Sequence, residues 1–244
     1  MNQQFLVIIP AFNEEENLGG VLEGLLAQGL PAHILVVDDG SLDRTAAVAA
    51  RYPVKVISHP YNLGYGAALQ TGYKYAVEKD YDYVLQFDAD GQHNPEDLHL
   101  IIAELLKGDA DILMGSRYLE GSTTFRSGPM KKAAVHFFRW LIRILTGVRV
   151  SDPTTGLRGI SKRVFHYYAV RDRFPADFPD ADILIQMILR KYRIREVPAH
   201  MRIREAGVSM HAGLKPLLYM MKVMISIFVV MLQYKMMKRV SYRE

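Results

Sequence analysis

Three oxygen-bearing side chains with alternate spacing follow one apolar, strand-like segment of the sequence. Asp88, Asp90 and Gln92 come directly after residues 83–87, and alternate residues of an extended chain point to the same side. Carboxylate and amide oxygens are the ligands that Mg²⁺ and Mn²⁺ prefer, and these ions often bridge to phosphates. The spacing therefore favours a metal site for a phosphate-bearing ligand. The alternative is an Asp-rich turn that caps the helix expected after Pro95.

Two further polar clusters follow predicted strands in the first half of the chain. Residues 10–14, Pro-Ala-Phe-Asn-Glu, end the first strand, and Asp38 with Asp39 ends the second. One carboxylate of this pair could accept a hydrogen bond from a base or a ribose, and the other could cap the next helix. Ligands of parallel α/β sheets bind at the carboxyl ends of the strands, so we expect both clusters to lie near Asp88.

Strand-like and helix-like segments alternate through this half. Apolar runs predict strands over residues 5–9, 34–37, 54–58, 83–87 and 111–114. Helical spacing predicts helices after an N-cap at Asn13, over 45–52, from the turn at 62–66 to about residue 78, and over 95–107. Such alternation indicates an α/β fold, in which a mostly parallel central sheet is flanked by helices on both faces.

Composition and charge narrow the class of protein. The chain has 244 residues, of which 50% are hydrophobic and 23% are charged, as expected for one large domain or a domain with an appendage. The absence of cysteine excludes disulfide scaffolds, thiolate zinc sites and cysteine nucleophiles. Residues 1–110 carry a net charge of −10, and residues 111–244 carry +14. The acidic half suits a bound cation, and the basic half suits phosphate, nucleic acid or a membrane surface.

Two segments of the second half have helical spacing with a narrow polar stripe. The first is 130–146, with Lys132, His136, Arg139 and Arg143 on its stripe, and the second is 214–234, with Lys215, Tyr219, Lys222, Ser226 and Gln233. Their wide apolar faces favour helices that lie in a membrane interface or in an oligomer contact, with two buried core helices as the alternative. Lys222 argues against a single membrane span over 217–234. We expect a domain over 1–212 and a C-terminal apolar helix with a basic flank over 213–244.

The order of the motifs resembles that of the family 2 glycosyltransferases of the GT-A fold. The residues that carry the resemblance are 9–14, 37–41, 62–66 and 88–93. Residues 114–118, 151–158 and 204–209 further resemble the polyprenyl-phosphate sugar transferases, of the dolichol-phosphate mannosyltransferase type. Phe12 stands where that family often has tyrosine, so a phenolic hydrogen bond is missing.

The resemblance implies a role for each matched residue. The nucleotide would be bound by Pro10, Phe12, Glu14, Asp39 and Asp88. The Mg²⁺ or Mn²⁺ ion would be held by Asp88, Asp90 and Gln92. Phosphates would be neutralised by Arg117 and Arg204, neither of which is expected to serve as a core contact. The acceptor phosphate would meet Lys131, Lys132, Arg204 and Ser209. The sugar would be oriented, or a hydroxyl acceptor deprotonated, by Asp180 or Asp182, for which capping of a helix over 183–191 is the alternative.

The activity that the resemblance implies is an inverting, metal-dependent transfer of a hexose to polyprenyl phosphate, with UDP-glucose or UDP-N-acetylglucosamine as the favoured donor. The expected location is the cytoplasmic face of the cell membrane, peripheral or single-span, with a small membrane protein or a second copy as a further partner. One alternative is transfer to a sugar hydroxyl in cell-wall polysaccharide assembly, which would need a general base. Another is an inactive subunit that binds the membrane or a partner. A nucleic-acid partner is not expected, because the basic residues line apolar helices.

Overall fold

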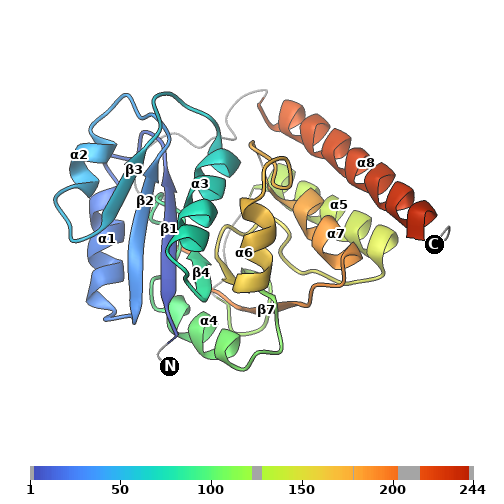
Figure 1. Ribbon diagram of the computed structural model, residues 1–244, viewed down its shortest axis with the longest axis horizontal. Helices are drawn as coiled ribbons and strands as arrows, with labels where there is room; N and C mark the ends of the chain where they lie inside the picture. The colour runs from blue at the N-terminus through green and yellow to red at the C-terminus, as the bar shows by residue number, and fades with distance from the viewer. Residues whose placement is uncertain (1–2, 123–127, 178, 203–214, 242–244) are drawn as a thin grey trace.

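A single seven-stranded sheet forms the centre of the molecule (Figure 1). The computed structural model describes residues 3–122, 128–177, 179–202 and 215–241. The strands are β1 (Phe5–Ala11), β2 (Ala32–Asp38), β3 (Lys55–Ser58), β4 (Tyr83–Gln86), β5 (Ile112–Ser116), β6 (Arg158–Ser161) and β7 (Ile194–Pro198). Their order is β3-β2-β1-β4-β6-β5-β7, and only β6 runs antiparallel to its neighbours among these seven. The predicted α/β class with a mostly parallel sheet is therefore confirmed.

Helices cover both faces of the sheet, which explains why the central strands are apolar throughout. Phe5, Val7 and Ile9 of β1 pack on one face with α1 (Leu18–Ala27), α2 (Thr45–Ala49) and α4 (Asp97–Leu106). Leu6 and Ile8 point the other way, because side chains alternate along a strand. That second face is covered by α3 (Tyr65–Glu78), α5 (Pro129–Thr146), α6 (Lys162–Ala169) and α7 (Ala181–Leu189).

The first helix begins later than the sequence predicts. Its first residue is Leu18, and Asn17 rather than Asn13 precedes it as the N-cap. Asn13 adopts a left-handed backbone conformation, with φ of 54°. Its Oδ1 accepts a hydrogen bond from the Leu42 N–H at 2.9 Å. Asn13, the residue expected to cap the helix, therefore links the first polar cluster to the loop after β2.

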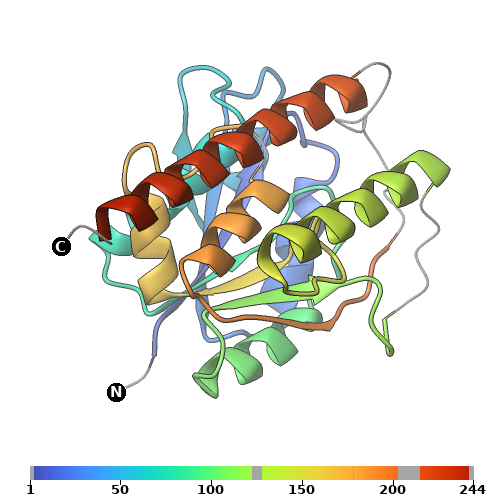
Figure 2. The ribbon, with the colours of Figure 1, turned by 90° about the vertical axis from the view of Figure 1, so that its right-hand side faces the viewer.

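The outer layer of the second half consists of α5, α7 and α8 (Lys215–Ser241). Helix α7 contacts both of the others and lies between them in Figure 2. Helix α8 buries Val223 and Ile227 in the same core as α7. Its exposed large side chains are Met221, Met224, Ile225, Phe228, Val229, Leu232 and Met236, and those of α5 are Trp140 and Ile144. Over the described ranges, no helix combines the length and the apolar character that crossing a bilayer requires.

Candidate active site

The first two polar clusters are joined at the carboxyl edge of the sheet. The Asp39 N–H donates to the Ala11 carbonyl at 2.8 Å, continuing the pairing of β1 with β2. The Asn13 N–H donates to Ser41 Oγ at 3.0 Å, and the Glu14 N–H donates to Thr45 Oγ1 at 2.9 Å. These bonds hold the two clusters next to each other at the carboxyl ends of β1 and β2.

Asp39 connects the second cluster to the turn that begins α3. Its side chain is only 3% exposed and accepts hydrogen bonds from the Leu63 N–H at 2.9 Å and the Gly64 N–H at 2.8 Å. His59 Nδ1 lies 2.7 Å from Asp39 Oδ1, and His59 Nε2 lies 2.9 Å from Thr71 Oγ1. The carboxylate thus fixes the loop beside it. The nucleotide contact expected for Asp39 stays a prediction.

Asp88 is the carboxylate on which the other motifs converge. Its Oδ1 accepts a hydrogen bond from the Tyr65 hydroxyl at 2.8 Å, and its Oδ2 lies 3.0 Å from His93 Nε2. Burial by itself raises the pKa of Asp88, but the bonds to His93 and Tyr65 outweigh it and lower the pKa below its ordinary value. Asp88 is therefore ionised at neutral pH.

A buried chain of hydrogen bonds sets the direction of the bond from Tyr65. The Tyr73 hydroxyl donates to Gln86 Oε1 at 3.1 Å, and Gln86 Nε2 donates to the Tyr65 oxygen at 2.9 Å. Because the Tyr65 oxygen accepts from Gln86, its own proton is directed to Asp88. Burial raises the pKa of Tyr65 well above its ordinary value, so this phenol stays a donor.

The antiparallel strand β6 brings a third motif against Asp88. Arg158 pairs with Gln86 across β6 and β4, and Gly156 lies directly against the Asp88 carboxylate. A Cβ at Gly156 would lie 2.0 Å from Asp88 Oδ2, so only glycine fits there. The buried Arg158 donates from Nη1 to the Pro179 carbonyl at 3.1 Å, and its Nη2 lies 3.8 Å from Asp180 Oδ1.

The donor set expected to hold a metal ion follows β4 as predicted. The Gln92 N–H donates to Asp90 Oδ1 at 3.0 Å, and the Gln92 carbonyl accepts from the Arg202 N–H at 2.7 Å. In the part of the chain that the structure describes, no group of three or more His, Cys, Asp or Glu side chains is arranged to hold a metal. The proposed set has two carboxylates and one amide, which suits a hard divalent ion that takes further oxygens from phosphates.

Arg117 is held in a buried ion pair, and the phosphate contact expected for it stays a prediction. Its side chain is 5% exposed and forms a two-pronged ion pair with Asp152, with Nε to Oδ2 at 2.6 Å and Nη2 to Oδ1 at 2.7 Å. Nη2 also donates to Thr154 Oγ1 at 2.7 Å. The expectation that Arg117 is no core contact is therefore wrong, because its removal would leave the Asp152 carboxylate buried and unpaired.

Asp182 is also turned into the protein. It is 1% exposed and lies between α7 and α8, where its Oδ2 accepts a hydrogen bond from the Ser226 hydroxyl. Its Oδ1 accepts from the Asp180 N–H at 3.1 Å. Burial raises the pKa of Asp182 to about 6, even though the bond from Ser226 lowers it. Asp180 precedes α7 as its N-cap but makes no side-chain capping hydrogen bond, and it is the acid that faces Arg158. The sugar contact expected for Asp180 or Asp182 stays a prediction.

Some of the remaining predicted site residues are described by the structure, and others are not. Pro10 is buried in β1, and Glu14 Oε2 accepts a hydrogen bond from Asn17 Nδ2 at 2.6 Å. Phe12 is 40% exposed, so its ring is accessible to a flat ligand such as a nucleotide base. Lys132 is exposed on α5. The side chain of Lys131 and the whole of Arg204 and Ser209 lie outside the described residues.

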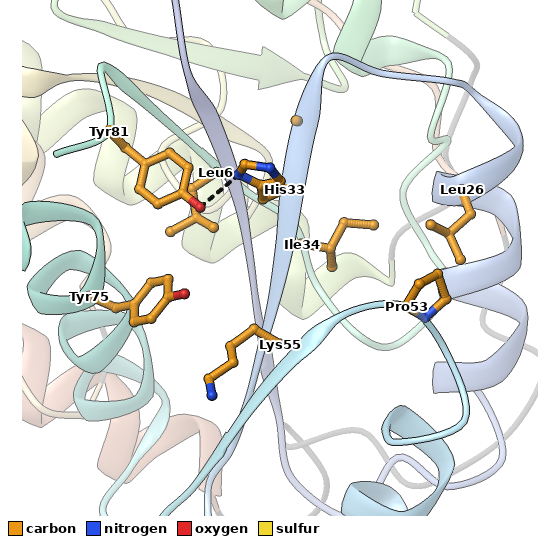
Figure 3. Close-up of a pocket in the computed structure, with 9 residues that line it drawn as sticks. Leu6, Leu26, His33, Ile34, Pro53, Lys55, Tyr75 and Tyr81 are labelled. Carbon is orange, nitrogen blue, oxygen red and sulfur yellow. Dashed lines mark hydrogen bonds between the residues drawn. The ribbon is translucent and has the colours of Figure 1, made fainter. Parts of the chain in front are cut away.

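A hollow of about 350 Å³ lies far from these residues (Figure 3). Leu6 and His33, which line it, stand near the amino ends of β1 and β2, whereas Asp39 follows the carboxyl end of β2. Its polar feature is a bond of 2.8 Å between His33 Nδ1 and the Tyr81 hydroxyl. No carboxylate lines the hollow, and we do not assign it to the site.

Comparison with known proteins identifies the family. The model of Glycosyl transferase family 2 matches residues 6–174. The chain belongs to this family. The matched stretch includes Asp39, Asp88 and Gly156.

Three individual proteins show how far the likeness extends. Polyprenol monophosphomannose synthase of Mycolicibacterium smegmatis is 33% identical over 86% of this chain and 82% of its own length. UDP-N-acetylglucosamine–dolichyl-phosphate N-acetylglucosaminyltransferase of Methanococcus voltae is 30% identical over 79% of this chain and 83% of its own. The crystal structure of glucosyl-3-phosphoglycerate synthase from Mycobacterium tuberculosis with Mn²⁺ and UDP-glucose superposes with a TM-score of 0.68. It is 18% identical, covers 93% of this chain and 79% of that one, and confirms the predicted GT-A fold.

Proposed function

We propose that this protein transfers a sugar from a nucleotide diphosphate sugar to a polyprenyl phosphate at a membrane surface. The observation that carries the proposal is the ionised Asp88 at the end of β4, which Tyr65 and His93 hold against Gly156. The two curated relatives support the acceptor class, because their names give different sugars but a polyprenol or dolichyl phosphate in both.

The donor would bind across the ends of β1, β2 and β4. Phe12 would contact the base, and Pro10, Glu14 and Asp39 would border the base and the ribose. Asp88, Asp90 and Gln92 would hold Mg²⁺ or Mn²⁺, which supplies positive charge beside the diphosphate. Stabilisation of the charge that develops on a leaving group is usually the largest single contribution to catalysis. In-line attack on the anomeric carbon would invert its configuration.

The acceptor would attack through a phosphate oxygen that is already anionic at neutral pH. A hydroxyl acceptor would instead require a positioned general base. The burial of Asp182 beneath α8 supports the phosphate acceptor, because this acid is not placed to deprotonate a substrate. The acceptor phosphate would be contacted by Lys131, Lys132, Arg204 and Ser209. Arg117 would hold the loop after α5 in place through its bonds to Asp152 and Thr154.

Peripheral attachment to the membrane would come from the exposed apolar side chains of the outer layer. Ile225 and Phe228 of α8 and Ile144 of α5 are each more than 60% exposed, and Trp140 of α5 is 57% exposed. Large exposed apolar surfaces mark contact with a membrane or a partner, and these helices carry basic residues at their polar positions. Attachment at the cytoplasmic face would bring the site to the lipid-linked acceptor.

The test is a donor panel with undecaprenyl phosphate in vesicles. UDP-glucose, UDP-N-acetylglucosamine and GDP-mannose are each added with Mg²⁺ or Mn²⁺, and both the glycolipid and the released nucleoside diphosphate are measured. We expect one donor to give glycolipid, with UDP-glucose and UDP-N-acetylglucosamine tried first, and a chelator to abolish the reaction. Transfer only to sugar hydroxyls would favour polysaccharide assembly. No transfer to either acceptor would favour an inactive binding subunit.

A further inference from the structure

Two residues of the polar stripe of α8, Lys222 and Ser226, contact other parts of the protein, whereas Gln233 of the same stripe is exposed. Lys222 Nζ lies 2.6 Å from Asp177 Oδ2, and the Ser226 hydroxyl donates to Asp182 Oδ2. Val223 and Ile227 are buried next to these two contacts, whereas Ile225 and Phe228 on the other side are exposed. Figure 2 shows α8 lying along α7. Lys222 therefore connects α8 to the loop before α7, and Ser226 connects it to the first turn of α7.

That loop is docked on the first turn of α3. The Gly66 N–H donates to the Asp177 carbonyl at 3.2 Å, and the Ala67 N–H donates to the Ala176 carbonyl at 2.9 Å. A Cβ at Gly66 would lie 2.0 Å from the Pro175 carbonyl oxygen, so the close approach depends on glycine. The loop thus supplies partners for N–H groups that a helix cannot satisfy by itself.

The first turn of α3 also carries Tyr65, which donates to Asp88 at 2.8 Å. A second connection reaches the same carboxylate, because Arg158 donates to the Pro179 carbonyl and follows the loop that packs Gly156 on Asp88. Two short paths therefore join the stripe of α8 to Asp88. One runs through Asp177 and the start of α3, and the other runs through Asp182, Pro179 and Arg158.

We propose that Lys222 and Ser226 are positioning residues for the active site, and that α8 acts as a brace for the residues around Asp88. Neither residue touches the reacting atoms. They contact Asp177 and Asp182. The carbonyls of Ala176 and Asp177 accept hydrogen bonds from the first turn of α3, which carries Tyr65, and the Pro179 carbonyl accepts one from Arg158. The assay of this inference rests on the proposed transferase function, while a second measurement does not.

The activity test uses a short-chain, water-soluble prenyl phosphate without vesicles, so that membrane attachment plays no part. Ser226→Ala and Lys222→Ala should each lower kcat by about tenfold, since small misplacements of catalytic groups have large effects on rate. The KM for the donor should stay unchanged. Ser226→Thr keeps the hydroxyl and should retain most of the activity. Gln233→Ala is the matched control, because Gln233 is exposed and lies two turns further along the same helix.

Amide hydrogen exchange provides a readout that does not depend on activity. The Gly66 and Ala67 amides should exchange faster in Ser226→Ala and Lys222→Ala, and at the original rate in Gln233→Ala. Faster exchange in a protein whose unaltered form glycosylates no prenyl phosphate would contradict the proposed function and support the brace. Original kcat values together with original exchange rates in both alanine variants would overturn the brace. Lys222 is exposed, so its variant remains a test even if Ser226→Ala fails to fold.

Discussion

The strand-end half of the site and the outer helical half use their charged residues differently. Asp39 and Asp88 stand where parallel strands end, and loops from distant parts of the chain converge on them. Arg117 directly follows β5 but is buried in an ion pair with Asp152, and Asp182 is buried beneath α8 beside Ser226. The Asp88 side chain is 24% exposed, whereas the Arg117 side chain is 5% exposed and Asp182 is 1% exposed, so the two regions differ in how accessible their charged groups are to a ligand.

The largest effect that would test this contrast is expected from Arg117→Ala. The change leaves Asp152 buried without its partner, and the free energy of unfolding should fall by about 3–5 kcal/mol. Urea unfolding followed by circular dichroism measures it. Arg117→Lys should recover part of the loss, because it keeps the charge but not the planar fork. An unchanged unfolding free energy with lost turnover would restore the direct phosphate role and remove the contrast.

A large loss of activity without a loss of stability is expected from Asp90→Asn. Turnover should fall by at least about a hundredfold, the scale on which a key electrostatic stabiliser acts. Steady-state release of nucleoside diphosphate measures this, with Asp172→Asn as a control because its side chain is 89% exposed. Near-normal turnover in a folded Asp90→Asn protein would show that Asp90 is not part of the active site.

A moderate effect is expected from Tyr65→Phe, which sharpens the contrast by testing how Asp88 is held. The change removes the donor to Asp88 and leaves the Gln86 amide without its acceptor, so kcat should fall about tenfold through misorientation. Tyr61→Phe, in the loop that precedes α3 and 64% exposed, is the control. Equal rates in the two variants would show that Asp88 does not depend on Tyr65.

The smallest effect is expected from pH, through Asp182. Its pKa is about 6 in the folded protein, above its ordinary value, so the folded state binds more protons than the unfolded state between about pH 4 and 6. The contribution of Asp182 to stability is therefore present at low pH and lost as the pH rises through this interval. Urea unfolding should show that the free energy of unfolding declines less steeply with rising pH in Asp182→Asn than in the unaltered protein. Parallel plots of unfolding free energy against pH for the two proteins would show that the Asp182 carboxyl does not cause the decline.

The sequence predicts strands β1 to β5 and the acids that follow β2 and β4, because their signals are local, but it does not predict β6 or β7. Apolar runs mark the parallel strands, and the acids follow directly. The sequence does not predict Tyr65 or Arg158 near Asp88. The bond from Tyr65 forms only when α3 packs beside β4, and Arg158 comes near only when β6 is placed beside β4. The sequence did contain one local signal of the buried hydrogen bonds near Asp88, because Gln86 is a polar residue that follows an apolar strand segment. The inward direction of Ser226 was not predictable either, as helical spacing gives a stripe but not the surface that the stripe meets.

The placement of β6 has a consequence for how the chain folds during synthesis. Strand β4 pairs with β1 on one side, but its other edge is filled by a strand that comes about seventy residues later. Until residues 158–161 have been made, β4 presents unpaired amide and carbonyl groups, and open edges of this kind promote pairing between chains. A nascent chain that already contains Asp39, Asp88 and Asp90 therefore has neither a closed sheet nor Gly156 against Asp88. The interval between β4 and β6 is the stage at which we expect the growing chain to depend most on chaperones.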